Sequence, residues 1–284
     1  MEKKTAVSTD ASKAEVKKGA TGSLFASIVI PVVFVISVLI YMFVLGNPAN
    51  FEGGNNENHP LPGNWLGIVY KGGPVVPVLL TLFILVFVFS IERMLTISKA
   101  KGNGSVPAFV RTVIAKLNQR DLRGAMAECD RQKGSVANVV KSGLHKYEEM
   151  LSEREMIKGE KVLAIQKEIE ESTALELPML EKNLVIISTI ASVATLTGLI
   201  GTVLGMIKAF AALATAGAPD AVALANGISE ALINTALGVT GSALAIIAYN
   251  YFTSKIDELT YSIDEAGFSI IQTFASHHET KPTV

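Results

Sequence analysis

Four long segments with almost no charge constrain the fold of this chain more than any other feature. They cover residues 24–45, 74–98, 183–212 and 221–253, and each exceeds the roughly 20 residues that an apolar helix needs to cross a bilayer. Hydrophobic residues make up 49% of the chain and charged residues only 18%, against about 25% in soluble domains. The sequence therefore predicts an all-α integral membrane protein with four transmembrane helices.

Basic residues predict the orientation of these helices. Of the 25 lysines and arginines, 23 lie before residue 24, between 93 and 183, or after 253. Because such residues concentrate on the cytoplasmic side of a membrane, we expect both termini to be cytoplasmic. The expected parts are a cytoplasmic tail at 1–23, an outer loop at 46–73, a cytoplasmic helical domain at 99–182, an outer loop at 213–220 and a cytoplasmic tail at 254–284.

Helix-breaking and helix-capping residues within the region 99–182 predict where its helices begin and end. Pro107 and Asp121 mark the starts of helices at about 108–118 and 121–134, and a third is expected at about 136–150. From Ser152 onward, charges at one-turn spacing predict a long helix that runs towards the third membrane segment, with Pro178 as a kink. The outer loop at 46–73 is rich in Asn, Gly and Pro, so we expect it to have little fold of its own.

The chain offers little for soluble enzyme chemistry. Cys129 is its one cysteine, and it has four histidines, so neither a disulfide framework nor a metal cluster is expected. No phosphate-binding loop, dinucleotide fingerprint or nucleophile elbow is found, and the net charge of −1 gives no footprint for nucleic acid. We expect no catalytic activity and no cofactor.

Small and polar residues distinguish the third and fourth segments from the first two. Small residues at intervals of four let membrane helices approach closely, so we expect helix packing at five glycines: Gly198, Gly201, Gly205, Gly227 and Gly238. On the fourth segment, Asn234, Thr235 and Ser242 extend the small residues into a polar stripe. Several copies of such helices round an axis would border a hydrated path, which implies a homo-oligomer.

Glu230 is the one charge expected deep within a membrane helix. With Asp220 as N-cap, it lies ten residues into the fourth segment, about 15 Å along the axis at about 1.5 Å per residue. A charge at such depth costs roughly 2.5–3.5 kcal/mol and faces a bundle interior, a cavity or a partner. Glu230 is therefore a functional candidate, with a structural hydrogen bond to a neighbouring helix as the alternative.

The stretches LEKNLVIISTIASVATLTGLIGTVLGMIKAF and GISEALINTALGVTGSALAIIAYNYF resemble the ExbB/TolQ/MotA family of bacterial proton-channel subunits, with ExbB and TolQ the most similar. The likeness covers about residues 72–260, and the first membrane segment is extra to the three-helix family plan. It implies a pentamer in the bacterial inner membrane around the single helices of two ExbD- or TolR-like chains. The proton-carrying aspartate would belong to that partner, and a TonB-like protein would be a further contact.

The resemblance also assigns residues. Glu230 and Thr235 occupy the acidic and threonine positions of the fourth segment, and Asn234 lies beside them on the expected pore side. Val193 stands where related chains carry a pore threonine, so either Thr197 or Thr195 is expected to replace it.

Three functions fit these features. The first is an energising subunit that transmits proton-motive force to the outer membrane for TonB-dependent transport or envelope maintenance. The second is a MotA-like stator or motor for motility. The third is a membrane scaffold without an ion path, which would explain the glycines but not Glu230.

Overall fold

The computed structural model describes residues 25–214 and 220–277 and confirms the all-α fold: these residues form helices and connections without a β-strand. Four helices are long and apolar enough to cross a membrane, within Phe25–Leu45, Gly73–Asn118, Lys158–Leu213 and Ala221–His277. The expected tail at 1–23 and most of the loop at 213–220 lie outside the described residues.

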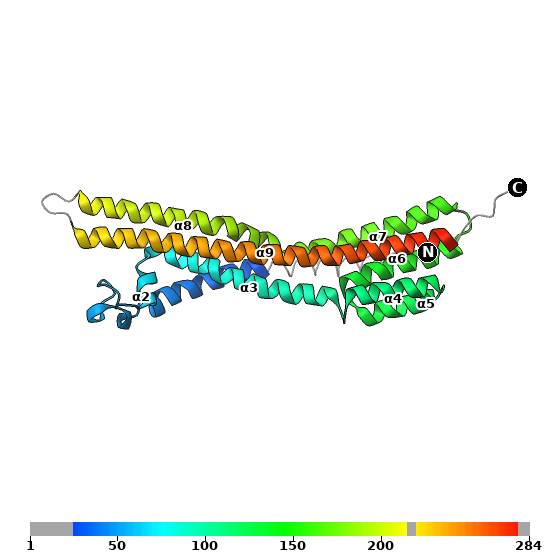
Figure 1. Cartoon of the computed structure of the whole chain (residues 1–284), viewed down its shortest axis with the longest axis horizontal. Coiled ribbons are helices and arrows are strands. Elements are labelled where there is room, and N and C mark those ends of the chain that lie inside the picture. The colour runs from blue at the N-terminus through cyan, green and yellow to red at the C-terminus, as the bar shows by residue number, and fades with distance from the viewer. Residues whose placement is uncertain (1–24, 215–219, 278–284) are drawn as a thin grey trace, which may run out of the picture. The chain divides into compact units, whose positions relative to one another are not determined.

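The chain divides into two compact units. The membrane unit comprises the described residues up to Ser90 together with Val185–Tyr249, and the polar unit comprises Ile91–Leu184 and the described residues from Asn250. The long helices α3 (Val76–Lys101) and α9 (Ala221–His277) contribute to both units, as Figure 1 shows.

Three helices lie together in the membrane unit. They are the first parts of α3 and α9 and most of α8 (Leu184–Leu213), which lie side by side in Figure 1. A β-carbon added at Gly198 would lie 2.9 Å from the Asn234 carbonyl oxygen, and one at Gly238 would lie 2.7 Å from the Ala194 carbonyl oxygen. Backbone thus packs directly on backbone between α8 and α9, which only residues without side chains allow.

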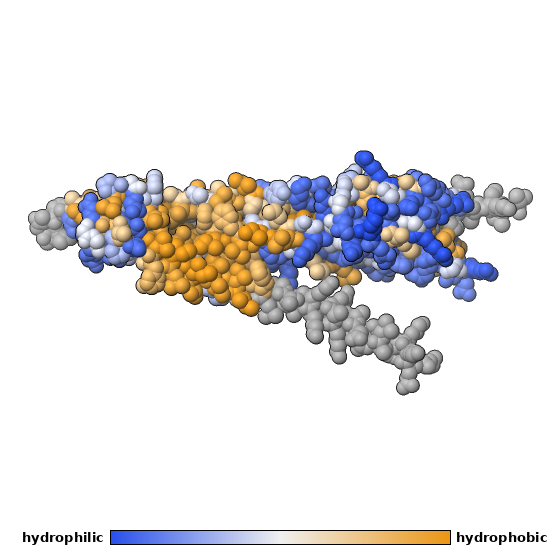
Figure 2. All heavy atoms as spheres, turned by 90° about the horizontal axis from the view of Figure 1, so that it is seen from below, coloured by the Kyte–Doolittle hydropathy of each residue, from blue (hydrophilic) through white to orange (hydrophobic). Residues whose placement is uncertain are grey.

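The first helix of the membrane unit, Phe25–Leu45, ends in a π-helical turn, η1 (Ile40–Leu45). Phe25 packs edge-on against Phe89 of α3, with ring centroids 6.2 Å apart. Most of its other large side chains are exposed, and they contribute to the continuous hydrophobic surface in Figure 2. Such a surface suits lipid, which solvates apolar side chains and leaves backbone groups bonded within the helix.

The loop at 46–73 is more ordered than the sequence predicted. It contains η2 (Pro48–Asn50), η3 (Glu52–Gly54) and α2 (Trp65–Tyr70), and η4 (Gly73–Val75) leads into α3. The Asn50 side-chain amide donates to the carbonyl oxygens of Val44 and Leu45, and the Asn64 side chain caps α2. The expectation of little fold was wrong because asparagine side chains bond to the backbone here without any repeating pattern.

The polar unit is a helical bundle. Its helices are the end of α3, α4 (Val106–Asn118), α5 (Leu122–Gln132), α6 (Gly134–Ser152), α7 (Lys158–Glu181) and the last part of α9. Val110, Val113, Leu144, Ile165 and Phe274 are among its fully buried side chains. The predicted starts of α4, α5 and α6 hold to within two residues, whereas α7 begins six residues after Ser152 and continues through Pro178. Asp121 caps α5 by accepting from the Gly124 amide at 2.8 Å.

The region after residue 253, which is expected to be a cytoplasmic tail, continues α9 as far as His277. Its buried side chains recur at intervals of three and four, at Ile256, Leu259, Ile263, Ala266, Ile270 and Phe274. This spacing gives α9 one apolar face that packs into the polar unit. Residues 278–284 lie outside the described residues.

Candidate functional site

Glu230 lies at the contact between α9 and α8, and it is paired. The Lys208 ammonium group on α8 is 2.6 Å from one carboxylate oxygen and 2.8 Å from the other. The Glu230 side chain is only 9% exposed, whereas that of Lys208 is 53% exposed. The sequence predicted Glu230 as a single charge among apolar residues, but the antiparallel register of the two helices brings Lys208 to it.

The backbone of Gly72 and Gly73 packs against Glu230 and Asn234 at the same site. Gly73 has φ +76°, which favours glycine, and a β-carbon there would collide with the Glu230 carboxylate. The Asn234 side-chain amide donates to the Gly72 carbonyl oxygen at 2.8 Å, and Asn234 is fully buried. Glu230 and Asn234 are therefore both held by the segment that connects the outer loop to α3.

Two threonines meet one turn further along α9. The hydroxyl groups of Thr235 and Thr202 form a hydrogen bond between α9 and α8. Each hydroxyl also lies within hydrogen-bonding distance of a carbonyl of its own helix, Gly198 for Thr202 and Ala231 for Thr235, both at 3.1 Å. The pair is half-buried, so both hydroxyls lie at the edge of the helix contact.

Thr202 was not among the predicted site residues, although it lies in the GLIGTVLG run. The signal that finds it is the packing register: Gly198 lies against Gly238 and Gly205 against Ala231, which leaves Thr202 opposite Thr235. The predicted pore positions, 193, 195 and 197, lie nearer the start of the segment.

Helix geometry separates those three positions. Thr195 precedes Thr202 by seven residues, about two turns, so both lie on one face of α8. Thr197 is five residues away and points roughly 140° round the helix. Val193, nine residues away, lies on the opposite side, where it is 38% exposed. Of the two candidate threonines, only Thr195 shares the face of the hydroxyl pair.

The predicted polar stripe serves largely as a packing face within one chain. Gly227, Ala231 and Gly238 contact the backbone of α8, and the Ser242 hydroxyl donates to the Ala191 carbonyl oxygen at 2.5 Å. Among the described residues, no group of three His, Cys, Asp or Glu side chains could hold a metal ion. The chemistry that the site offers is therefore a carboxylate, an ammonium group and hydroxyls that can exchange hydrogen-bond partners.

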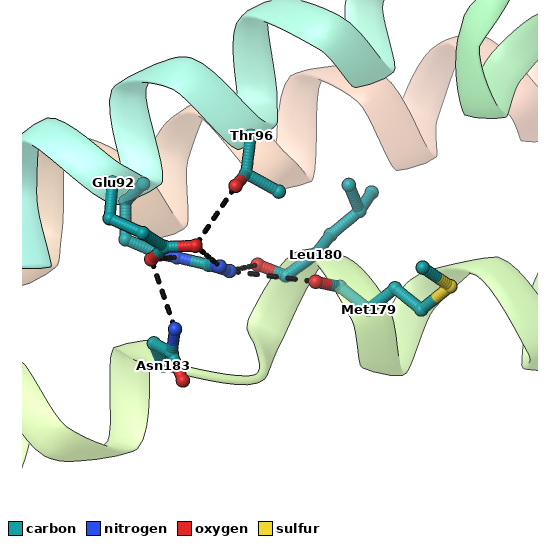
Figure 3. A network of polar contacts seen from close by, with 6 residues as sticks. Glu92, Thr96, Met179, Leu180 and Asn183 are labelled. Atoms are coloured by element: carbon teal, nitrogen blue, oxygen red, sulfur yellow. Dashed lines mark hydrogen bonds and ion pairs between the residues drawn. The ribbon is translucent and has the colours of Figure 1, made fainter. Parts of the chain in front are cut away.

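A second polar cluster lies in the polar unit, at the break between α7 and α8 (Figure 3). Arg93 is 2% exposed and donates to the Leu180 carbonyl oxygen at 2.8 Å. It also pairs with Glu92, which accepts from the Thr96 hydroxyl and from the Asn183 amide, both at 3.0 Å. A cation thus caps the carbonyl groups at the end of α7, and the Glu92 carboxylate joins α3 to the break between α7 and α8.

These features define a class: a multi-span helical membrane protein in which a buried carboxylate pairs with an ammonium group between two closely packed helices. The comparisons with known proteins name the family. Residues 131–265 match the MotA/TolQ/ExbB proton channel family, so the chain carries a domain of that family. This region contains α8, the first part of α9 and thus the Glu230 site.

Curated relatives agree with this assignment. The chain is 40% identical over 80 residues to the Tol-Pal system protein TolQ of Pseudomonas aeruginosa, an alignment that spans 28% of this chain and 35% of the relative. It is 42% identical over 81 residues to the biopolymer transport protein ExbB of Helicobacter pylori (28% and 56%), and 28% identical over 196 residues to a putative ExbB homolog of Methanothermobacter thermautotrophicus (69% and 65%). The chain thus spans less than two thirds of each of these relatives.

Proposed function

We propose that this protein is an ExbB/TolQ-like subunit of a motor driven by proton-motive force. The proposal rests on one observation: within the segment that matches the family, Glu230, Lys208 and the Thr202–Thr235 pair lie at one contact between two membrane helices. A buried carboxylate paired in this way is typical of ion and proton pathways in membranes. A scaffold without an ion path would need only the glycine contacts.

In this proposal several copies of the chain, a pentamer in keeping with the family resemblance, surround two single-span chains of the ExbD/TolR type. The partner supplies the carboxyl group that carries the proton, and this chain supplies the polar wall. Thr202 and Thr235 can each donate or accept, so their mutual bond can open and re-form with a partner group. Thr195, two turns along α8, extends the hydroxyl-bearing face.

The Glu230–Lys208 pair has a separate role in the proposal. Lys208 donates to both oxygens of the Glu230 carboxylate, so the two side chains form one dipole beside the partner chain on which protons pass. A fixed local dipole of this kind would orient the partner's carboxyl group without itself binding the proton. One proton crossing 100 mV supplies about 2.3 kcal/mol, so several protons would drive one mechanical step.

We place the protein in the bacterial inner membrane with both termini in the cytoplasm. The distribution of basic residues supports this orientation, with the polar unit inside and the loop at 46–73 in the periplasm. Energy would then reach the outer membrane through the partner, for TonB-dependent transport or for envelope maintenance.

The test is proton flux in liposomes that contain this chain with a co-expressed single-span partner bearing an intramembrane aspartate. Glu230→Gln and Thr235→Ala should each lower the flux by about tenfold or more, because each removes a preorganised polar group that orients the proton-carrying carboxyl group of the partner. Thr240→Ala is the matched control, because Thr240 is an exposed threonine five residues along the same helix. The proposal fails if wild-type protein with its partner conducts no protons, or if both site variants conduct normally at normal protein levels. A motility defect without a transport or envelope defect would favour the MotA-like function.

A further inference from the structure

A cavity of about 370 Å³ opens within the polar unit, where the second and fourth membrane helices leave their apolar stretches. Its walls come from the end of α3, the start of α4 and the part of α9 that follows Tyr249. The volume falls within the range of about 300–1,000 Å³ that small-molecule sites occupy. The proposed proton pathway uses none of its lining residues.

The cavity changes from apolar to charged along its length. At the end near the membrane segments, Met94 and Tyr251 are exposed, and Ile97 and Phe252 form buried apolar walls. Seven residues beyond Met94 on the same helix, the cavity is lined by Lys101. This order suits an amphiphile that enters with its chains towards the bilayer.

The dimensions match the headgroup layer of a membrane. Seven helical residues span about 10 Å. The headgroup region on each side of a bilayer is about 5–8 Å thick, the difference between a core of about 30 Å and a total of about 40–45 Å. Along α3, the distance from Met94 to the lysine end of the cavity is therefore comparable to the thickness of one headgroup layer.

The charges favour an anion. Lys101 and Lys255 line the cavity together with one acidic residue, Glu258, whose carboxylate is 2.7 Å from the Lys255 ammonium group. The three groups leave a net charge of +1, which matches one phosphodiester. Ser105 also lines the cavity as the residue before α4, and its side chain makes no capping bond, so the positive end of that helix adds to the field.

We propose that this cavity binds one anionic phospholipid, with its phosphate at Lys101 and the start of its acyl chains between Ile97 and Phe252. The apolar end distinguishes this occupant from a free phosphate or a nucleotide, which would gain nothing from it. A lipid held there would attach the polar unit to the membrane surface, independently of whether the protein conducts protons.

The test measures lipid selectivity. The full chain is reconstituted in phosphatidylcholine vesicles with a trace of spin-labelled phosphatidylglycerol or spin-labelled phosphatidylcholine, and electron paramagnetic resonance gives the fraction of immobilised label. We expect the wild type to prefer phosphatidylglycerol about fivefold, the factor that corresponds to about 1 kcal/mol per lysine at a membrane surface. Lys101→Gln should reduce this preference to nearly none.

Lys99→Gln is the matched control, because Lys99 is an exposed lysine two residues away on α3 and does not line the cavity. It should retain the preference. Ser98→Trp, which fills the cavity without changing charge, should abolish it, and Ser105→Trp provides the same test from the start of α4. The proposal is overturned if Lys101→Gln retains the selectivity, if Lys99→Gln loses as much, or if excess inorganic phosphate displaces the lipid.

Discussion

Adding one methyl group at Gly205 should separate α8 from α9. A β-carbon there would lie 2.6 Å from the Ala231 backbone nitrogen and 2.7 Å from the Gly227 carbonyl oxygen. Ordinary contacts of this kind begin at 3.4 Å, so the helices would have to move apart by about 0.8 Å. Both obstructing atoms belong to backbone, which cannot rotate away as a side chain can.

The cost can be estimated against a matched variant. Overpacking in a tight contact costs about 1–3 kcal/mol, and a gap of about 0.5–1 Å removes a quarter to a half of the dispersion energy of the atoms that separate. Gly241→Ala is the control, because a β-carbon at Gly241 meets the Ala194 side chain at an ordinary 3.7 Å. Both variants gain the same helix propensity, so their difference isolates the packing cost.

The assay is reversible unfolding of the full chain in mild detergent by titration with sodium dodecyl sulfate, followed by circular dichroism. Gly205→Ala should be about 1–3 kcal/mol less stable than Gly241→Ala, with reduced proton flux in the presence of the partner chain. Equal stability of the two variants would refute close backbone packing as the basis of the α8–α9 contact.

Three further outcomes are expected. Lys208→Met should lower the free energy of unfolding by about 1–3 kcal/mol because it leaves the buried Glu230 carboxylate unpaired. In a double-mutant cycle, adding Glu230→Gln should restore most of this loss, and additive effects of the two substitutions would exclude a direct pair. Arg93→Met should cost about 3–5 kcal/mol, as for other broken buried pairs, and a loss below about 0.5 kcal/mol would show that the cluster in Figure 3 is dispensable. Burial raises the pKa of the Cys129 thiol from 9.0 to about 12, so the folded state keeps the thiol neutral. Maleimide labelling at neutral pH should therefore require unfolding, and rapid labelling of the folded protein would contradict the burial of Cys129. The contribution of this neutral thiol to the free energy of unfolding should be intact below pH 9 and lost as the pH rises towards 12.

The sequence predicted more of the membrane helices than of their connections. Long apolar stretches identify a spanning helix without tertiary information, because the bilayer requires every backbone group to be bonded within the segment. The loop at 46–73 was misjudged because its order comes from individual asparagine side chains such as Asn50. The last part of α9 had a visible signal, the spacing of Ile256, Leu259 and Ile263, but it follows a charged turn at Lys255 and was assigned to a tail.

The candidate site was predicted in part. Glu230 was found from its rarity alone, since a charge in an apolar helix is costly wherever that helix packs. Its partner was not found, because Lys208 lies 22 residues earlier, across the turn between two helices. Thr202 was missed for the same reason: its hydroxyl is one of several along α8, and only the helix contact selects it.

The sequence by itself determined which segments are apolar enough to enter a membrane, where the charges concentrate and which acidic side chain lies among apolar residues. These are properties of local composition, and the bilayer acts on each helix separately. The tertiary structure decided which side chains meet. The pairing of Lys208 with Glu230 and of Thr202 with Thr235 depends on the register at which α8 and α9 pack, and glycine contacts between these helices set that register. The contact of Arg93 with the end of α7 likewise joins residues that lie 87 positions apart in the chain.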